Sequence, residues 1–104
     1  MDFTNVKLEA KAGIYRNGKI ICRNFYLPDG EMKTLGYNAA GEYDFKTGSP
    51  ELIEITQGEM AIKLPGEATF TNYGPGACIK VPANTAFDAI VKDYVDYVCS
   101  YPND

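Results

Sequence analysis

The chain has 104 residues, of which 45% are hydrophobic, and its formal net charge is −4. This length suits one domain spanning residues 1–104, and the hydrophobic content is too high for a disordered chain. The acidic balance argues against a nucleic-acid partner, because binding a phosphate backbone needs a basic face, although one or two cations are enough to bind a small anion.

Turn signals recur roughly every 8–12 residues, a spacing typical of β-sandwiches and barrels. The strongest is Asn17-Gly18, which predicts a type I′ hairpin between Ile14-Tyr15 and Ile20-Ile21, because both turn positions must tolerate positive φ. No stretch sustains a helical apolar period. Runs rich in β-branched and aromatic residues predict about nine or ten strands, once one or two of these ranges merge: 6–12, 14–16, 19–27, 32–37, 42–47, 51–57, 59–64, 69–73, 77–81, 86–91 and 95–101. So many strands must hide their edges, which predicts an all-β jelly-roll barrel.

The three cysteines, Cys22, Cys78 and Cys99, are far apart, and none belongs to a Cys-x-x-Cys motif. We expect free thiols packed as small hydrophobic side chains, and the odd count favours a reducing compartment. The N-terminal residues show no long apolar run, and no window has the length of a membrane span. A cytoplasmic protein without membrane contact is therefore expected.

Residues 41–58 carry most of the chemistry. Alternation puts three residues on one face of the first strand in this segment: Tyr43, Phe45 and Thr47. In the next strand, Glu51 shares its face with Ile53 and Ile55. A carboxylate on an apolar face is costly to desolvate unless it is paired or functional. Glu51 is thus either a functional group or a solvated or paired residue at the open end of its strand.

The spacing of these residues resembles that of the cupins. Their first motif ends in a Glu followed seven residues later by a Gly, as Glu51 and Gly58 are, and their second begins Gly-x5-Pro, as in Gly76 to Pro82. The cupin histidine positions fall on Phe45, Thr47 and Phe87. Because the chain contains no histidine, a metal of the cupin type is excluded, and we expect no metal and no other cofactor. The predicted fold is a single-domain, metal-free cupin-type jelly-roll barrel.

Several segments together resemble the pyrimidine/purine nucleoside phosphorylase family. They are Lys33-Thr34-Leu35-Gly36, Gly41 to Thr47, Pro50-Glu51, Val81-Pro82-Ala83-Asn84 and Asp96 to Tyr101. The resemblance, which covers about residues 18–101, implies a small cupin-like enzyme without a metal. It also implies a pentosyltransferase that cleaves purine and pyrimidine nucleosides with inorganic phosphate, releasing the free base and ribose 1-phosphate. The chain departs from the family at Tyr37, where a small apolar residue is usual, and in the C-terminal extension Pro102-Asn103-Asp104.

This reaction needs a carboxylate beside a cation-like sugar, a surface for the base and a site for phosphate. We predict Glu51 as the first catalytic carboxylate and Glu42, at the mouth of the same strand pair, as the second. The substrate-binding candidates are Tyr43, Phe45, Thr47 and Phe87, of which the three rings can stack on any base. The same rings would also suit a plain barrel core.

The phosphate-binding candidates are Arg23, Lys33 and Thr34. Alternation puts Arg23 on the face of Ile21 and Phe25, which predicts an inward guanidinium, whereas an edge-strand charge is the other interpretation. Lys33 and Thr34, with Gly36 nearby, offer an ammonium, a hydroxyl and close backbone approach. Arg16, beside the hairpin turn, is expected to be solvated.

Two other functions fit the same residues: a non-catalytic binder of a small sugar or nucleoside-like ligand, and a structural homodimer whose barrel is filled by side chains. A homodimer is expected for the enzyme as well, because tyrosine is enriched at interfaces. The tyrosines available for such an interface are Tyr73, Tyr94, Tyr97 and Tyr101.

Overall fold

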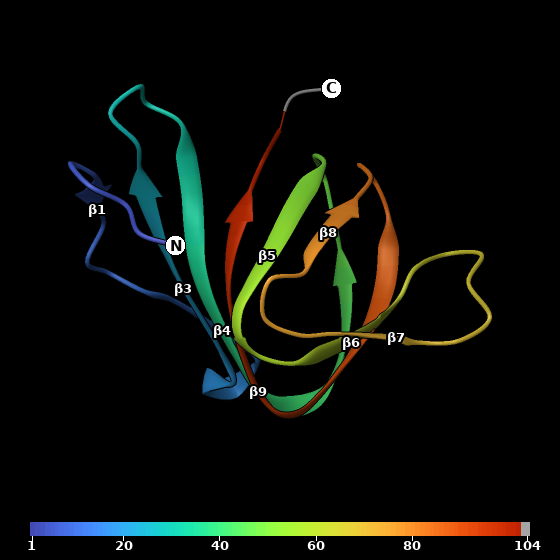
Figure 1. The fold of residues 1–104 in the computed structure, drawn as a ribbon. Helices are drawn as coiled ribbons and strands as arrows, with labels where there is room; N and C mark the ends of the chain where they lie inside the picture. The colour runs from blue at the N-terminus through green and yellow to red at the C-terminus, as the bar shows by residue number, and fades with distance from the viewer. Residues whose placement is uncertain (103–104) are drawn as a thin grey trace.

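The computed structural model describes residues 1–102, and Asn103 and Asp104, which end the predicted domain and the C-terminal extension, lie outside the described residues. Within residues 1–102 the chain forms nine strands and one short 3-10 turn, η1 (Figure 1). Their bounds are β1 Lys7–Leu8, β2 Gly13–Tyr15, η1 Arg16–Gly18, β3 Ile20–Tyr26, β4 Met32–Lys46, β5 Glu51–Gly58, β6 Met60–Lys63, β7 Thr71–Tyr73, β8 Cys78–Val81 and β9 Ala86–Ser100. The all-β prediction is confirmed. Across the described part of the chain, no helix has the length and apolar character needed to cross a membrane.

Two long antiparallel strands, β4 and β9, organise the fold. They pair from Lys33↔Ser100 to Lys46↔Ala86, and the register shifts at a bulge between Ala39 and Gly41. Both strands curve through the bottom of the view in Figure 1. Each of them therefore merges two of the predicted strands, because a bulge bends a strand without ending its pairing.

The bend lets β4 and β9 contribute to two groups of strands. On one side of the bend the order is β1-β3-β4-β9-β5-β8, with β2 paired to β3. On the other side, β6 pairs with the first half of β9, and β7 pairs with β6. Among the described residues, the pairing does not return from β8 to β1, so the sheet folds into an open jelly roll.

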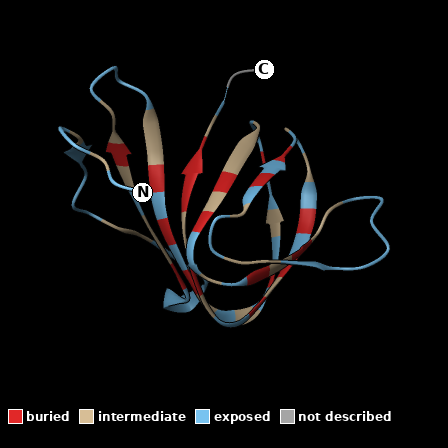
Figure 2. Cartoon of the chain, in the orientation of Figure 1, coloured by how far each residue is buried: buried red, intermediate tan, exposed pale blue. Residues whose placement is uncertain are grey.

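The core lies between these two groups of strands, and buried and exposed positions alternate along the strands that enclose it (Figure 2). Along β5, Ile53 and Ile55 are buried, whereas Thr56 and Gln57 at its far end are exposed. The predicted inner face of residues 43–47 is confirmed, because Tyr43 and Thr47 are buried and the intervening Asp44 is exposed.

The predicted hairpin at Asn17-Gly18 is also confirmed. The register pairs Ile14 with Ile21, and both turn residues have positive φ, 58° for Asn17 and 86° for Gly18. The backbone of Arg16 also lies in the left-handed region, with φ 54°, which is uncommon for a residue other than glycine. The hairpin therefore leaves the sheet at a fixed angle that depends on three successive left-handed residues.

Gly58, at the end of β5, occupies a position that tolerates no side chain. Its φ is +77°, and an added Cβ would overlap the backbone oxygen of Tyr94. We expect Gly58→Ala to lower the free energy of unfolding by more than about 3 kcal/mol, because left-handed strain and a backbone clash add together. Gly76→Ala is the matched control, since Gly76 has φ +90° but no atom within 4 Å of an added Cβ.

Gly76→Ala should cost only the strain of a left-handed alanine, about 1–2 kcal/mol. Urea denaturation of both variants measures the difference. Equal losses for the two would show that the close approach of Tyr94 to Gly58 does not constrain the fold.

Candidate active site

Three cavities open beside the core, and Phe45 and Lys46 line all of them. An inner chamber of about 140 Å³ lies against Asn38, Ile53 and Met60. An outer chamber of about 530 Å³ extends from it towards the β2–β3 hairpin. Glu51, Tyr97 and Cys99 line both chambers. A broader depression of about 790 Å³ opens from Phe45 and Phe87 towards the loop after β6.

Glu51 faces this interior, as the alternation of residues along its strand predicted. It is half-buried at the start of β5, and the Cys99 thiol donates to its Oε1 with an S–O distance of 3.6 Å. Burial raises the pKa of Glu51, and the bond from Cys99 offsets part of that increase. Burial, together with the nearby Glu51 charge, raises the pKa of Cys99 to about 12. At neutral pH the thiol is therefore a protonated donor that faces the carboxylate.

Two tyrosines of the C-terminal segment complete the polar wall. The Tyr101 hydroxyl lies 2.8 Å from Thr34 Oγ1, and the Tyr97 hydroxyl donates to Asn38 Oδ1 at 2.9 Å. Burial raises the pKa of both phenols, so they too remain protonated. The interior therefore presents neutral hydrogen-bonding groups around one carboxylate.

Gly36 makes room for one of these rings. A Cβ at this position would overlap the ring of Tyr97, which lies directly over it on the neighbouring strand. The close backbone approach that we predicted at Gly36 for phosphate is therefore not available, because the Tyr97 ring fills the space. Tyr97 and Tyr101, which we assigned to a dimer interface, instead face the interior.

The aromatic candidates form a continuous stack. Tyr43 and Phe45 lie 5.5 Å apart between ring centroids at 16°, and Phe45 and Phe87 lie 5.6 Å apart at 48°. Phe45 and Phe87 line the inner chamber. Tyr43 is buried behind Phe45, where its hydroxyl donates to the Ala39 carbonyl, and it is part of the core rather than of the chamber wall.

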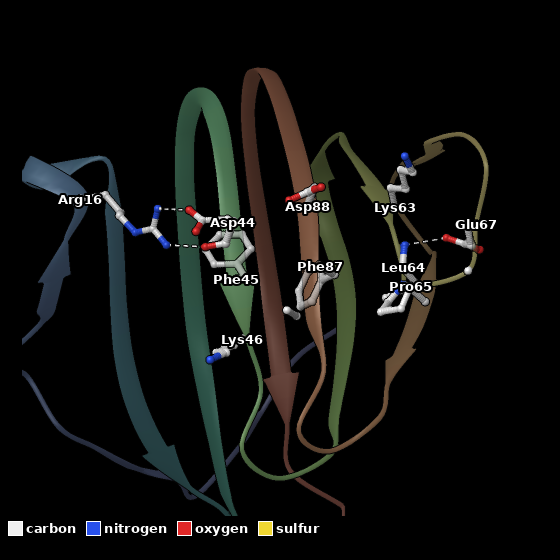
Figure 3. A pocket seen from close by; sticks show the side chains of 12 residues that line it. Arg16, Asp44, Phe45, Lys46, Lys63, Leu64, Pro65, Glu67, Phe87 and Asp88 are labelled. Atoms are coloured by element: carbon white, nitrogen blue, oxygen red, sulfur yellow. Dashed lines mark hydrogen bonds and ion pairs between the residues drawn. The ribbon is translucent and has the colours of Figure 1, made fainter.

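Arg16 is exposed, as predicted, but the sequence did not place it at the site. Its guanidinium lies 5.5 Å from the ring centroid of Phe45 and donates to Oδ1 of Asp44 at 3.2 Å and to the Asp44 carbonyl (Figure 3). It lines the outer chamber together with Lys46. The sequence placed Arg16 beside a turn, but only the left-handed path of the hairpin brings it back across the end of β4.

Three other predicted site residues do not join the site. Glu42 is exposed on the outer face of β4, so it does not join Glu51. Arg23 is also exposed, and its Nε donates to the Ala10 carbonyl at 3.0 Å, so the predicted inward orientation is wrong. Thr47 is buried, but its hydroxyl donates to the Pro82 carbonyl at 2.6 Å and accepts from the Thr85 N–H, which ties down the β8–β9 loop.

Lys33 and Thr34 do not act as a pair, because consecutive residues of a strand face opposite sides of the sheet. Thr34 lines the outer chamber. Lys33 lies on the opposite face, where its Nζ is 2.6 Å from Ser100 Oγ and 3.2 Å from Glu31 Oε2. Tyr37 also faces outwards, where its ring stacks on that of Tyr94.

The residues that the structure describes include no group of three or more His, Cys, Asp or Glu side chains arranged to hold a metal ion. Cys22 and Cys99 both border the outer chamber, and burial raises the pKa of both thiols, which disfavours the thiolate that a soft metal needs. The residues present thus favour an organic ligand over a metal in this interior.

Comparison with known proteins gives the following matches. A family model described as pyrimidine/purine nucleoside phosphorylase matches residues 10–101. A Geobacter sulfurreducens protein of that name is 43% identical over 96% of both chains. A crystal structure of an Acinetobacter protein of unknown function has a TM-score of 0.92 at 29% identity, covering 97% of this chain and 98% of that one. A cupin superfamily protein from Desulfitobacterium hafniense has a TM-score of 0.64 at 16% identity, over 86% and 83% of the two chains, which shows the cupin-like fold.

Replacing Glu51 should reveal the cost of placing a carboxylate in this cavity. Its raised pKa means that the folded chain holds the Glu51 proton more tightly than the unfolded chain does. The associated stability is therefore present below the ordinary carboxyl pKa and is lost as the pH rises through the raised one. Glu51→Gln, which stays neutral, should match the parent melting temperature near pH 4 and exceed it increasingly towards pH 8.

Glu54→Gln is the control, because Glu54 points away from the chambers on the same strand. Thermal melts of the three proteins across this pH range make the comparison. A Glu51→Gln advantage that stays constant with pH would mean that the carboxylate is not desolvated.

Proposed function

The chain belongs to the pyrimidine/purine nucleoside phosphorylase family, and from this membership we propose that it is a broad-specificity nucleoside phosphorylase. As a pentosyltransferase, it would transfer ribose from purine and pyrimidine nucleosides to inorganic phosphate. The observation that carries the proposal is the position of Glu51, a carboxylate inside an aromatic-lined cavity with two cations, Arg16 and Lys46, at its opening.

The cavity matches the three parts of the substrates. The ribose lies beside Glu51, where the two chambers join, and the base stacks on Phe45 and Phe87 in the inner chamber. Phosphate binds at the rim on Arg16 and Lys46, with the Thr34 hydroxyl facing the same chamber. Base and phosphate are then on opposite sides of the sugar, which is the geometry that a displacement at C1′ needs.

The chemical step requires little from the protein except charge and position. The bond between C1′ and the base nitrogen breaks and its electron pair leaves with the base, while a phosphate oxygen forms the new bond to C1′. The proton of hydrogen phosphate ends on the base, so the products are the free base and ribose 1-phosphate. As positive charge develops on the sugar, the half-buried Glu51 carboxylate stabilises it.

Arg16 has the capacity to bind phosphate without leaving its present partners. Two of its five N–H donors bond to Asp44, and three remain for an anion. Stacking on Phe45 holds the guanidinium plane at the rim. Arg23 and Lys33, our sequence candidates, have no access to this chamber because they lie on the outer face.

We further propose a cytoplasmic homodimer. The outer face of β4 exposes 42% of Leu35 and 39% of Tyr37, and the ring of Tyr37 stacks on Tyr94 at 6.2 Å. This apolar surface is where we propose contact with a second copy.

The enzymatic proposal is tested with metal-stripped protein, uridine, inosine and adenosine, with and without phosphate. We expect free base to be released only with phosphate and in equal amount to ribose 1-phosphate. Glu51→Ala should lower kcat by about 100-fold or more with a smaller change in KM, because the carboxylate acts mainly in the transition state. In the parent, kcat should fall as the pH falls through the raised pKa of Glu51.

Release that ignores phosphate would refute the phosphorylase reaction. If nucleosides stabilise the protein thermally but no base appears, the chain is a binder and not an enzyme. An unchanged kcat in Glu51→Ala would remove Glu51 from the mechanism.

The phosphate site is tested with Arg16→Gln. We expect the KM for phosphate to rise roughly tenfold, because a bidentate charged contact is lost, while the KM for the nucleoside changes little. Lys80→Gln, an exposed cation on the outer face of β8, is the control and should leave both constants unchanged. If Arg16→Gln keeps the parent KM for phosphate, the anion binds elsewhere.

A further inference from the structure

The wall of the inner chamber includes a buried amide that the fold does not fully use. Asn38, near the bend of β4, is only 1% exposed, and its neighbours Ile53 and Met60 are apolar. A buried polar group in such surroundings costs free energy unless its hydrogen bonds are made. Asn38 is therefore a residue whose presence needs an explanation.

The fold makes only part of the hydrogen bonds that this amide can form. Its Oδ1 accepts one bond, from the Tyr97 hydroxyl, and its Nδ2 has a weak contact with the thioether of Met60 at 3.9 Å. A side-chain amide has two N–H donors and an oxygen with two lone pairs. Among the bonds that the structure describes, one donor and one acceptor site of Asn38 remain for a ligand in the chamber.

We propose that Asn38 is a specificity-determining residue that binds the hydrogen-bonding edge of the base. This inference rests on the proposed phosphorylase function, because it takes the ligand of the inner chamber to be the base of a nucleoside. An amide presents a donor and an acceptor side by side, which complements a base edge with an adjacent acceptor and donor. The ribose, which needs the carboxylate of Glu51, stays nearer the opening.

The walls of the chamber favour this orientation. Phe45 and Phe87 supply two rings and Ile53 and Met60 supply aliphatic surface, which suit a flat ring better than a hydroxyl-rich sugar. Tyr97 fixes the Asn38 amide by donating to its oxygen, and the Tyr97 ring is in turn held over Gly36. The polar contact of the base is thus positioned by two strands, β4 and β9.

The test compares inosine with purine riboside, which lacks the oxygen at C6 and the hydrogen at N1. The parent protein should prefer inosine in kcat/KM by roughly ten- to hundredfold, the discrimination that a bidentate contact gives. In Asn38→Leu the preference should fall towards one, mainly through a loss on inosine. Asn72→Leu, at an exposed asparagine of β7 that bonds to Glu59, is the matched control and should keep the parent ratio.

Asn38→Leu leaves the Tyr97 hydroxyl without its acceptor, which could destabilise the fold. The double variant Asn38→Leu/Tyr97→Phe removes both hydrogen-bond partners and is therefore measured as well. A uniform loss on both nucleosides with an unchanged ratio would make Asn38 merely structural and overturn the inference. A parent ratio near one would also overturn it.

Equilibrium binding separates this inference from the proposed function. Hypoxanthine and purine are titrated into the parent and Asn38→Leu without phosphate. If the parent releases no base from any nucleoside, the phosphorylase function fails, but tighter binding of hypoxanthine that is lost in Asn38→Leu still supports a base-binding role. Equal binding of the two bases, or no binding of either, contradicts that role.

Discussion

The pairing of β4 with β9 is the constraint on which the rest of the structure depends. These strands run side by side from Lys33↔Ser100 to Lys46↔Ala86, and each of the other sheet neighbours attaches to one half of them or to a strand that does. The site has the same origin, because the pairing brings Asn38 and Phe45 of β4 into one interior with Phe87 and Cys99 of β9. A cavity built in this way is held by backbone hydrogen bonds on two sides, which suits catalysis by position and charge.

The bulge between Ala39 and Gly41 also decides which residues can take part. Before it, the inward residues of β4 are even-numbered, such as Thr34 and Asn38, and after it they are odd-numbered, such as Tyr43 and Phe45. At the bulge only Ala40 separates the paired residues of β4, whereas Lys92 and Asp93 separate those of β9, so the pairing changes phase there. The bend therefore does two things at once: it folds the sheet around the core and brings the Asn38 amide to the same cavity as the Phe45 ring.

Sequence reasoning succeeded where the chemistry follows from local alternation. The inward faces of Phe45 and Glu51 and the hairpin at Asn17-Gly18 needed only the period of a strand or the φ requirement of a turn.

Prediction from the sequence failed where the position of a side chain depends on a distant strand. Arg23 does share a face with Phe25, as the alternation predicted. However, Phe25 is buried against Phe3 outside the barrel, so this face is not the one that lines the interior. Arg16 and Tyr97 reach the site through the hairpin path and the β4–β9 pairing, which no local pattern reveals.

Under the proposed function, the arrangement of charge accounts for how an acidic chain would bind an anionic substrate. The carboxylate is inside, where burial raises its pKa and thiol and phenol protons surround it, and the cations Arg16 and Lys46 are at the opening. In the proposed mechanism, an arriving phosphate would meet positive charge first and would be kept from Glu51 by the sugar between them. If the cation were inside, it would pair with Glu51 and neutralise the charge that the developing oxocarbenium ion needs. Under the proposed function, keeping Glu51 apart from Arg16 lets one cavity both attract phosphate and stabilise a cation.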